Sequence, residues 1–259
     1  MTVLLTGAAG HIGTMLRERL PTYGWHLRLF DRVPLDGAIV GDGTDPAVLD
    51  TALQEPTEAI VHMAGQATEA SWPAIREANI EALYQLFEAA RRHGVRRIVY
   101  ASSNHAAGFT PRVDELPADT PPRPDTLYGV SKAFGEVLAR YYVDRYAMQV
   151  ACLRIGACAP TPPNRRALAV WLSPDDCARL VDAALRAPNL SYALVWGVSA
   201  NTRRWWSLVA GRAIGYEPQD DAEAFADRFG HMPPMPYEDL VGGEYTTAEF
   251  GIDEVLARE

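Results

Sequence analysis

TGAAGHIG, at residues 6–13, is the most informative stretch of this 259-residue sequence. It follows a short apolar run, Val3–Thr6, and opens an amphipathic stretch, Ile12–Leu20. Three glycines spaced three apart let a chain turn tightly, approach a pyrophosphate and pack a helix close to a strand. Phosphate groups bind readily at the positive N-terminus of such a helix. The stretch therefore predicts a dinucleotide site in a first βαβ unit, rather than a purely structural turn.

Short apolar runs alternate with amphipathic stretches over the first 155 residues, which is the pattern of stacked βαβ units. The runs show little polar alternation, as in parallel sheets that are covered on both faces. We expect strands at Val3–Thr6, Leu27–Phe30, Ala38–Val40, Ala59–His62, Ile98–Ala101 and Gln149–Ile155. We expect helices at Ile12–Leu20, Pro46–Leu53, Pro73–His93 and Asp125–Tyr146. The predicted fold class is α/β, a Rossmann-type doubly wound parallel sheet with a small C-terminal substrate lobe.

The regular alternation of apolar runs and amphipathic stretches ends after Gly156. We predict that residues 1–155 form an NAD-binding core with the catalytic residues, and that residues 156–259 form a small substrate-binding portion of the same domain. Pro160–Asn164 has the composition of a loop. Ser173 should cap a helix that begins with a proline and two acidic residues and runs to about Arg186. His231–Pro236 contains three prolines and should be irregular.

Composition narrows the class of protein. The chain is 48% hydrophobic and 22% charged, as in ordinary globular proteins, and its formal charge of −9 argues against a nucleic-acid surface. Cys152, Cys158 and Cys177 match no metal-ligand spacing and are interpreted as structural thiols. The chain opens directly into an apolar run, without a basic leader, and no run is long enough to cross a membrane. The expected compartment is the cytoplasm.

Several polar residues are candidates for contacts with the cofactor. Asp31 ends the second expected strand, where a carboxylate binds an adenosine ribose and repels a 2′-phosphate, which favours NAD over NADP. Arg32 beside it leaves NADP open. Asp42 could contact the adenine amino group or be an ordinary loop acid. Asn79, inside a long expected helix, either hydrogen-bonds a neighbouring strand or faces solvent.

The fourth expected strand ends at His62–Gly65 in small residues, which would let its backbone lie against the cofactor. The expected cofactor is NAD, and no metal is expected. The residues expected to contact NAD are Gly7, Ala9, Gly10, His11, Ile12, Gly13, Asp31, Arg32, Asp42, Gly43, Met63, Ala64, Gly65, Asn79, Tyr128, Lys132 and Ile155.

Tyr128 and Lys132 are the candidate proton-transfer pair. They lie four residues apart and so share one face of a helix. A free phenol has a pKa near ~10, and a neighbouring ammonium and the positive nicotinamide ring are both expected to lower it. Ser103 lies at the end of the fifth expected strand, where ligands meet an open α/β sheet, and can polarise the reacting oxygen. The glycine motif, serine, tyrosine and lysine in this order predict a dehydrogenase site.

These motifs together resemble the extended short-chain dehydrogenase/reductase family over essentially the full length. ASSNH at 101–105, LYGVSK at 127–132, RIG at 154–156, VWG at 195–197 and AEAF at 222–225 are similar to the bacterial uronate dehydrogenases of that family. The resemblance implies NAD-dependent oxidation of the anomeric carbon of D-galacturonate or D-glucuronate to an aldarolactone.

The resemblance also assigns roles in substrate binding. Asn104 and His105 would hydrogen-bond sugar hydroxyls, and Arg166 would hold the carboxylate, because a guanidinium matches a carboxylate bidentately. The family has substrate-contacting serines where this chain has Ala67 and Ala157, and one lost charged hydrogen bond is worth about 1.5–3 kcal/mol. A related aldose or sugar acid is therefore an alternative substrate. The expected substrate contacts are Ala67, Ser103, Asn104, His105, Tyr128, Ala157 and Arg166.

Two other functions are compatible with the same motifs. A nucleotide-sugar epimerase or dehydratase would usually need a larger C-terminal lobe than the residues after Gly156 provide. A non-enzymatic NAD-sensing regulator often lacks the tyrosine–lysine pair, which is intact here. By analogy with the family, we expect a homo-oligomer that pairs through Pro73–His93 and Asp125–Tyr146.

Overall fold

A single parallel sheet of seven strands organises the chain. The computed structural model describes residues 1–230 and 235–251. The sheet has the strand order β3-β2-β1-β4-β5-β6-β9, and every neighbouring pair in it is parallel. The order reverses between β1 and β4, so the carboxyl ends of these strands form a crevice. Its strands are β1 (Thr2–Thr6), β2 (His26–Asp31), β3 (Ala38–Val40), β4 (Ala59–His62), β5 (Arg97–Ser103), β6 (Gln149–Ile155) and β9 (Tyr192–Gly197).

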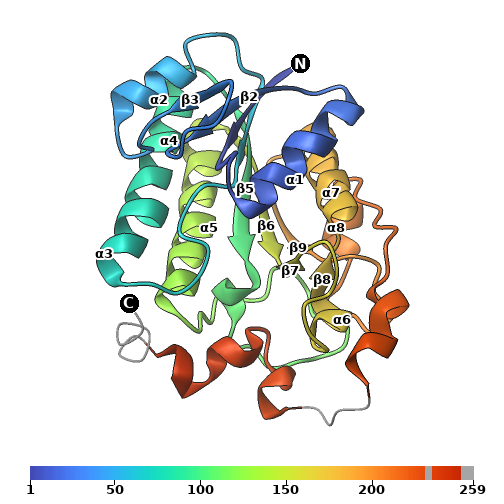
Figure 1. Cartoon of the computed structure of the whole chain (residues 1–259). Helices are drawn as coiled ribbons and strands as arrows, with labels where there is room; N and C mark the ends of the chain where they lie inside the picture. The colour runs from blue at the N-terminus through green and yellow to red at the C-terminus, as the bar shows by residue number, and fades with distance from the viewer. Residues whose placement is uncertain (231–234, 252–259) are drawn as a thin grey trace.

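Helices cover both faces of the sheet, as Figure 1 shows. On one face, α1 (His11–Arg19) packs beside α7 (Pro174–Arg186). On the other face lie α2 (Pro46–Ala52), α4 (Ala82–Arg92) and α5 (Leu127–Tyr146). Each layer has its own core of buried apolar side chains, one from each face of the sheet. The predicted doubly wound α/β sheet is confirmed.

The residues after 155 are more deeply involved in the sheet than the sequence suggested. β9 pairs in register with the whole of β6 from Val150 to Ile155, and α7 contributes Leu180, Val181 and Ala184 to the core. Position 155 is therefore not a boundary of the sheet or of its core, as expected for two portions of the same domain. The role of the C-terminal portion in substrate binding stays a prediction.

The helix expected at Pro73–His93 is divided into three parts. α3 (Trp72–Ile75) leads into a π-helical turn (Arg76–Glu81), which continues into α4. Such turns insert an extra residue into an α-helix and are frequent at functional sites. Asn79 lies within this turn, and its side chain is buried instead of facing solvent.

The predicted caps and loops are largely as the sequence indicated. Ser173 Oγ accepts a hydrogen bond from the Asp176 amide at 2.9 Å, and α7 ends at Arg186 as predicted. Pro160–Asn164 has no regular structure. Of the segment His231–Pro236, residues 231–234 lie outside the described residues, and Pro236 begins a short 3₁₀ helix. Further small elements are α6 (Ala167–Val170), α8 (Val209–Ala213) and the pair β7 (Ala157–Cys158) and β8 (Trp171–Leu172).

Candidate active site

The glycine turn joins β1 to α1 in a conformation that only small residues allow. Gly7 has a φ of 71°, and a Cβ there would meet the Ala64 amide nitrogen at 2.5 Å. A Cβ on Gly13 would meet the Gly7 carbonyl oxygen at 2.0 Å, so α1 packs directly on the turn. Gly10 caps α1 without a side-chain hydrogen bond, and the first helical turn carries no acidic residue. The helix N-terminus therefore keeps its amides and positive dipole available for an anion.

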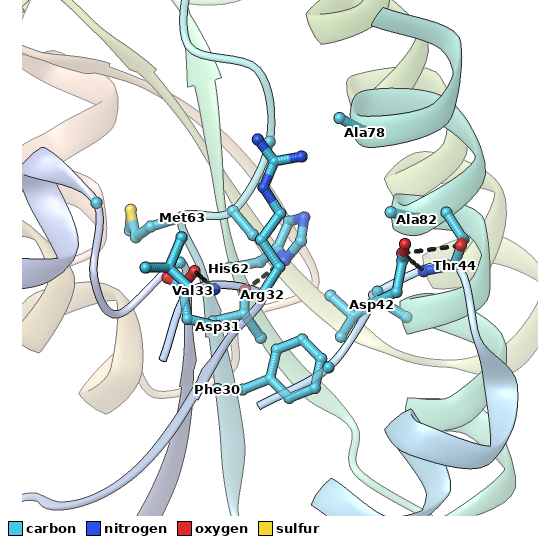
Figure 2. A pocket seen from close by; sticks show the side chains of 18 of the residues that line it. Phe30, Asp31, Arg32, Val33, Asp42, Thr44, His62, Met63, Ala78 and Ala82 are labelled. Atoms are coloured by element: carbon cyan, nitrogen blue, oxygen red, sulfur yellow. Dashed lines mark hydrogen bonds between the residues drawn. The ribbon is translucent and has the colours of Figure 1, made fainter. Parts of the chain in front are cut away.

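Asp31 connects the end of β2 to this turn. Its carboxylate accepts hydrogen bonds from the amides of Ala9 at 2.8 Å and Val33 at 2.9 Å. The side chain is thereby fixed at the crevice, as Figure 2 shows for Asp31 and its neighbours. A carboxylate held in this way still has lone pairs free to accept a hydrogen bond from a ribose hydroxyl.

A cavity of about 300 Å³ lies along the crevice and brings ten of the expected cofactor contacts together. In Figure 2, Met63 lies to the left of Arg32, and Asp42, Thr44, Ala78 and Ala82 lie to its right. The Asp42 carboxylate accepts two hydrogen bonds from Thr44 at 2.8 Å, which hold the pKa of Asp42 below its usual range. The ten are Gly7, Ala9, Gly10, Asp31, Arg32, Asp42, Gly43, Met63, Ala64 and Gly65.

Other expected cofactor contacts do not line this cavity. Gly13 acts through packing, and the His11 ring contacts the Cys158 carbonyl oxygen at 3.0 Å instead. Ile12, Ile155, Tyr128 and Lys132 are also absent from its lining. The sequence analysis missed the apolar wall of the cavity, formed by Phe30, Leu49, Ala82 and Leu86. Their apolar character is no different from that of core residues, so the sequence gives no signal for this role.

Asn79 joins the cleft to α5. Its amide oxygen accepts from the Gln66 amide at 2.6 Å, and its amide nitrogen donates to Gln66 O at 3.1 Å and Ser131 Oγ at 2.9 Å. The expected hydrogen bond to a neighbouring strand is thus made to the loop after β4. Gly65, with a φ of 136°, lies against the same amide.

Tyr128 and Lys132 lie where α5 passes the end of β5. Lys132 Nζ is 5.5 Å from the centre of the Tyr128 ring and donates a hydrogen bond to the Ala101 carbonyl at 2.8 Å. Both side chains are buried. Ser103 ends β5, and its hydroxyl accepts a hydrogen bond from the His105 amide at 3.2 Å. The structure therefore brings the three expected catalytic residues together.

In the protein without ligands, the pKa of Tyr128 is raised, whereas the sequence predicted that a neighbouring charge lowers it. Burial raises the pKa of Tyr128 to about 12, although hydrogen bonding with Ser103 opposes the rise. Burial also lowers the pKa of Lys132 to about 8. Lys132 has therefore lost its charge at the pH where Tyr128 would ionise, so it cannot stabilise the phenolate there. Below about pH 8 Lys132 carries its charge, but the Tyr128 phenol is protonated in the protein without ligands.

Glu69, which the sequence analysis missed, fixes the start of α5. Its carboxylate accepts hydrogen bonds from the amides of Leu127 at 3.1 Å and Tyr128 at 2.7 Å, and Thr126 caps the same turn through Gly129. An acid at a helix N-terminus satisfies amides that lack partners and complements the dipole. Glu69 lies 59 residues before Tyr128 in the chain, so no local pattern indicates this contact.

A second missed acid, Asp125, orients His105. The Asp125 carboxylate contacts His105 Nδ1 at 2.8 Å, and its side chain is fully buried. The His105 ring lies 5.8 Å from the Tyr128 ring, edge to face. Asp125 therefore holds one ring nitrogen and leaves the other available, beside the phenol, for a polar group of a substrate.

Next to this ring lies a cavity of about 430 Å³ that brings together four expected substrate contacts, Asn104, His105, Ala157 and Arg166. Asn104 Nδ2 donates to the Val241 carbonyl at 2.9 Å, so its amide oxygen remains for a ligand. Ala67 is exposed and is not among the residues that line this cavity, so its role in substrate binding stays a prediction; Thr68 beside it contacts the hydroxyl of Tyr245 in the cavity wall. Ser103 and Tyr128 are not among the residues that line this cavity, although the Tyr128 ring lies next to that of His105.

Arg166 is held at the end of this cavity. It donates through Nη2 to the Val241 carbonyl and lies beneath Gly243, while its Nε is buried without a partner among the described residues. Burial lowers the pKa of Arg166 to about 10, which reflects the cost of a guanidinium that lacks a close counter-ion. An anionic ligand in the cavity would relieve that cost.

Tyr245 is a further wall residue that the sequence did not reveal. Its ring lies 4.3 Å from the His105 ring and 4.1 Å from Phe250, and its hydroxyl meets Thr68 Oγ1 at 3.0 Å. The C-terminal segment thus contributes part of the cavity wall, including Tyr237, Gly242 and Tyr245. Two further properties concern only the described part of the chain. It has no cluster of three metal-ligating side chains and no helix that could span a membrane.

An open parallel sheet with a glycine turn at its crevice and a buried Tyr-x-x-x-Lys pair beside it defines an extended short-chain dehydrogenase-type protein. The model of the NAD dependent epimerase/dehydratase family matches residues 3–161, and the chain belongs to this family.

Relatives of known name are similar over nearly the whole chain. A uronate dehydrogenase from Agrobacterium fabrum is 44% identical over 90% of this chain and 90% of its own. One from Pseudomonas putida is 42% identical over 95% of this chain and 96% of its own. A solved structure of a mutant uronate dehydrogenase from Agrobacterium tumefaciens, complexed with NAD, is 41% identical with a TM-score of 0.88, covering 95% of this chain and 96% of that one.

Proposed function

We propose that the protein oxidises the anomeric C1 hydroxyl of a hexuronic acid, D-galacturonate or D-glucuronate, to an aldarolactone with NAD⁺. Relatives named uronate dehydrogenase support this, with identities of 42–44% over at least 90% of the chain. The observation that carries the proposal is the cavity in which Asn104, His105 and Arg166 meet next to Tyr128. It offers the Arg166 guanidinium for a carboxylate, and the side chains of Asn104 and His105 for sugar hydroxyls.

The cleft fits a dinucleotide at each of its parts. The pyrophosphate would lie on the amides of the glycine turn, where Gly7 and Gly10 leave the backbone bare. Asp31 would accept hydrogen bonds from the adenosine ribose and disfavour a 2′-phosphate, so NAD is the preferred cofactor despite Arg32. Bound NAD⁺ supplies the acceptor for the hydride that leaves C1.

The protein's own residues handle the proton. Ser103 and Tyr128 would hold the C1 hydroxyl, and Tyr128 takes its proton as the C1–H bond breaks. Lys132, charged below about pH 8, would favour the phenolate form of Tyr128 together with the positive nicotinamide ring of bound NAD⁺. The products are the lactone, NADH and one proton, which balances the two-electron oxidation.

Substrate specificity tests this proposal directly. NADH formation at 340 nm should be fast with galacturonate or glucuronate and slow with galactose and glucose, because only the acids engage Arg166. Arg166→Gln should raise KM for the acids at least tenfold and leave KM for the neutral sugars unchanged. Equal rates on acids and neutral sugars would assign the chain to the alternative, a dehydrogenase of a related aldose, and Ala157 in the wall is compatible with that outcome.

We also propose a homo-oligomer that pairs through α4 and α5. Large apolar side chains are exposed along these helices: Tyr84 (43%), Val130 (40%), Val137 (65%) and Tyr141 (52%). Exposed apolar patches of this kind mark protein interfaces, and a second copy presents the same pair of helices. In sedimentation velocity, the chain should be larger than a monomer and Val137→Glu should reduce it to one. A monomeric wild-type chain would refute this.

The proposed compartment is the cytoplasm. Cys152, Cys158 and Cys177 are free thiols, and two of the three are buried. Free thiols are usual where the redox environment is reducing. Fractionation of cells that produce the chain would test this, and recovery with the envelope fraction would contradict it.

A further inference from the structure

A third cavity, of about 340 Å³, lies on the other side of Arg166 from the substrate cavity. Four of the residues that line it are arginines, and we call it the arginine cavity. Its lining residues are Arg112, Arg165, Arg166, Ala169, Arg203, Trp205 and Glu238.

The positive charge of the arginine cavity is only partly neutralised. Glu238 pairs with Arg165, and Glu223 pairs with Arg203 through two hydrogen bonds of 2.6 and 2.8 Å. Within the described residues, Arg112 and Arg166 form no salt bridge. Two guanidinium charges thus remain uncompensated in one small cavity of a chain whose formal charge is −9. Like charges gathered in this way raise the local concentration of counter-ions.

The two uncompensated arginines are placed by groups other than acids. Arg112 is an exposed residue whose guanidinium lies 5.7 Å from the centre of the Trp205 ring, and the backbone at Arg112 is fixed by a hydrogen bond from its amide to the Asp239 carbonyl at 2.7 Å. Arg166 is anchored by the Val241 carbonyl and keeps a buried Nε without a partner among the described residues. Planar guanidiniums oriented by such contacts lose little freedom when they bind an oxyanion.

We propose that the arginine cavity is a binding site for a small dianion, of the class of inorganic phosphate or a short dicarboxylate. Its size accommodates a few heavy atoms, and guanidinium forks match the paired oxygens of phosphate and carboxylate. A dianion neutralises the two charges that Arg112 and Arg166 leave uncompensated. The site adjoins the substrate cavity, with which it shares Arg165, Arg166 and Glu238, whereas Arg112 and Arg203 line only the arginine cavity.

Calorimetric titration tests this proposal without any turnover. Inorganic phosphate and, separately, malonate are titrated into the whole chain at low chloride, in the presence of NAD⁺ to compete for the glycine turn. The double variant Arg112→Gln, Arg203→Gln should weaken binding of the dianion at least tenfold. Arg140→Gln is the matched control, since Arg140 pairs with Asp144 on α5 with both side chains 58% exposed, and it should bind as the wild type does.

A second variant guards against misfolding of the first. Ala169→Asp places a carboxylate on the cavity wall and removes no arginine, so it should also abolish binding. If either dianion still bound to both variants with the affinity of the wild type, the anion site would lie elsewhere and the proposal would be overturned. Absence of measurable binding of both dianions to the wild type, or equal loss in Arg140→Gln, would overturn it as well.

Discussion

Replacing Lys132 by methionine separates the catalytic value of its charge from the cost of burying it. The ammonium lies 5.5 Å from the centre of the Tyr128 ring. At an effective dielectric constant of about 20, a unit charge at this separation stabilises the phenolate by 332/(20 × 5.5), or about 3 kcal/mol. At ~1.36 kcal/mol per tenfold change, Lys132→Met should lower kcat on a uronate roughly a hundredfold.

The same change should make the fold more stable near neutral pH. The pKa of Lys132 falls from 10.5 to about 8 in the folded protein, a difference of 10.5 − 8 = 2.5, because burial disfavours the charge. The unfolded chain then binds more protons, so the penalty is complete below about pH 8 and disappears as the pH rises to 10.5. It amounts to about 3.4 kcal/mol, and the lost hydrogen bond to Ala101 offsets about 1 kcal/mol of the gain. A net stabilisation of about 2 kcal/mol is expected at pH 7.

Two measurements on one pair of proteins check this. NADH formation at 340 nm gives kcat, and urea unfolding followed by circular dichroism at pH 7 and pH 10 gives the free energy of unfolding. The advantage of Lys132→Met over wild type should shrink at pH 10. A variant that keeps full turnover, or one that is less stable than wild type at pH 7, refutes the assignment of a buried, charged Lys132 beside the phenol.

Three further substitutions test separate parts of the structure. Tyr128→Phe should reduce turnover at least a thousandfold while the affinity for NAD⁺, measured by calorimetry, stays within about twofold, because the ring remains and only the acid–base hydroxyl is lost. Asp125→Asn should lower kcat/KM about tenfold, because His105 loses the anion that orients it; unchanged kinetics would show that the contact is not needed. Arg154→Met should cost about 3–5 kcal/mol of unfolding free energy in a urea titration, because it leaves the carboxylate of Glu136 buried with only Ser102 as partner; a loss under 1 kcal/mol would contradict this.

Much of the fold could be predicted because its signals are local. The glycine turn needs neighbouring residues only, and the runs at Ala38–Val40, Ala59–His62 and Gln149–Ile155 are apolar enough to give strand bounds without error. β9 escaped prediction because it pairs only with β6, and its first residues are half-buried, as expected of an edge strand. The π-helical turn at Arg76–Glu81 is likewise a product of the tertiary contacts of Asn79 rather than of helix propensity.

The candidate site divides in the same way. Tyr128 and Lys132 share a helix face through a spacing visible in the sequence. Glu69, Asp125 and Tyr245 act on that pair or on His105 from other elements, and an acid or an aromatic in a loop carries no sign of its eventual partner. The pKa of Tyr128 was misjudged for a related reason, because charge proximity can be inferred from spacing, whereas burial depends on the whole fold.

The loop after β4 contributes to the dinucleotide cleft and, through the carboxylate of Glu69, contacts the start of α5. The segment that follows β4 first supplies Met63, Ala64 and Gly65 to the floor of the dinucleotide cleft, and a few residues later it ties down the first amides of α5. A shift of this loop would therefore be transmitted through Glu69 to the first residues of α5, which include Tyr128. Occupancy of the cleft and alignment of the proton acceptor are thereby mechanically linked through a stretch of only seven residues, from Met63 to Glu69.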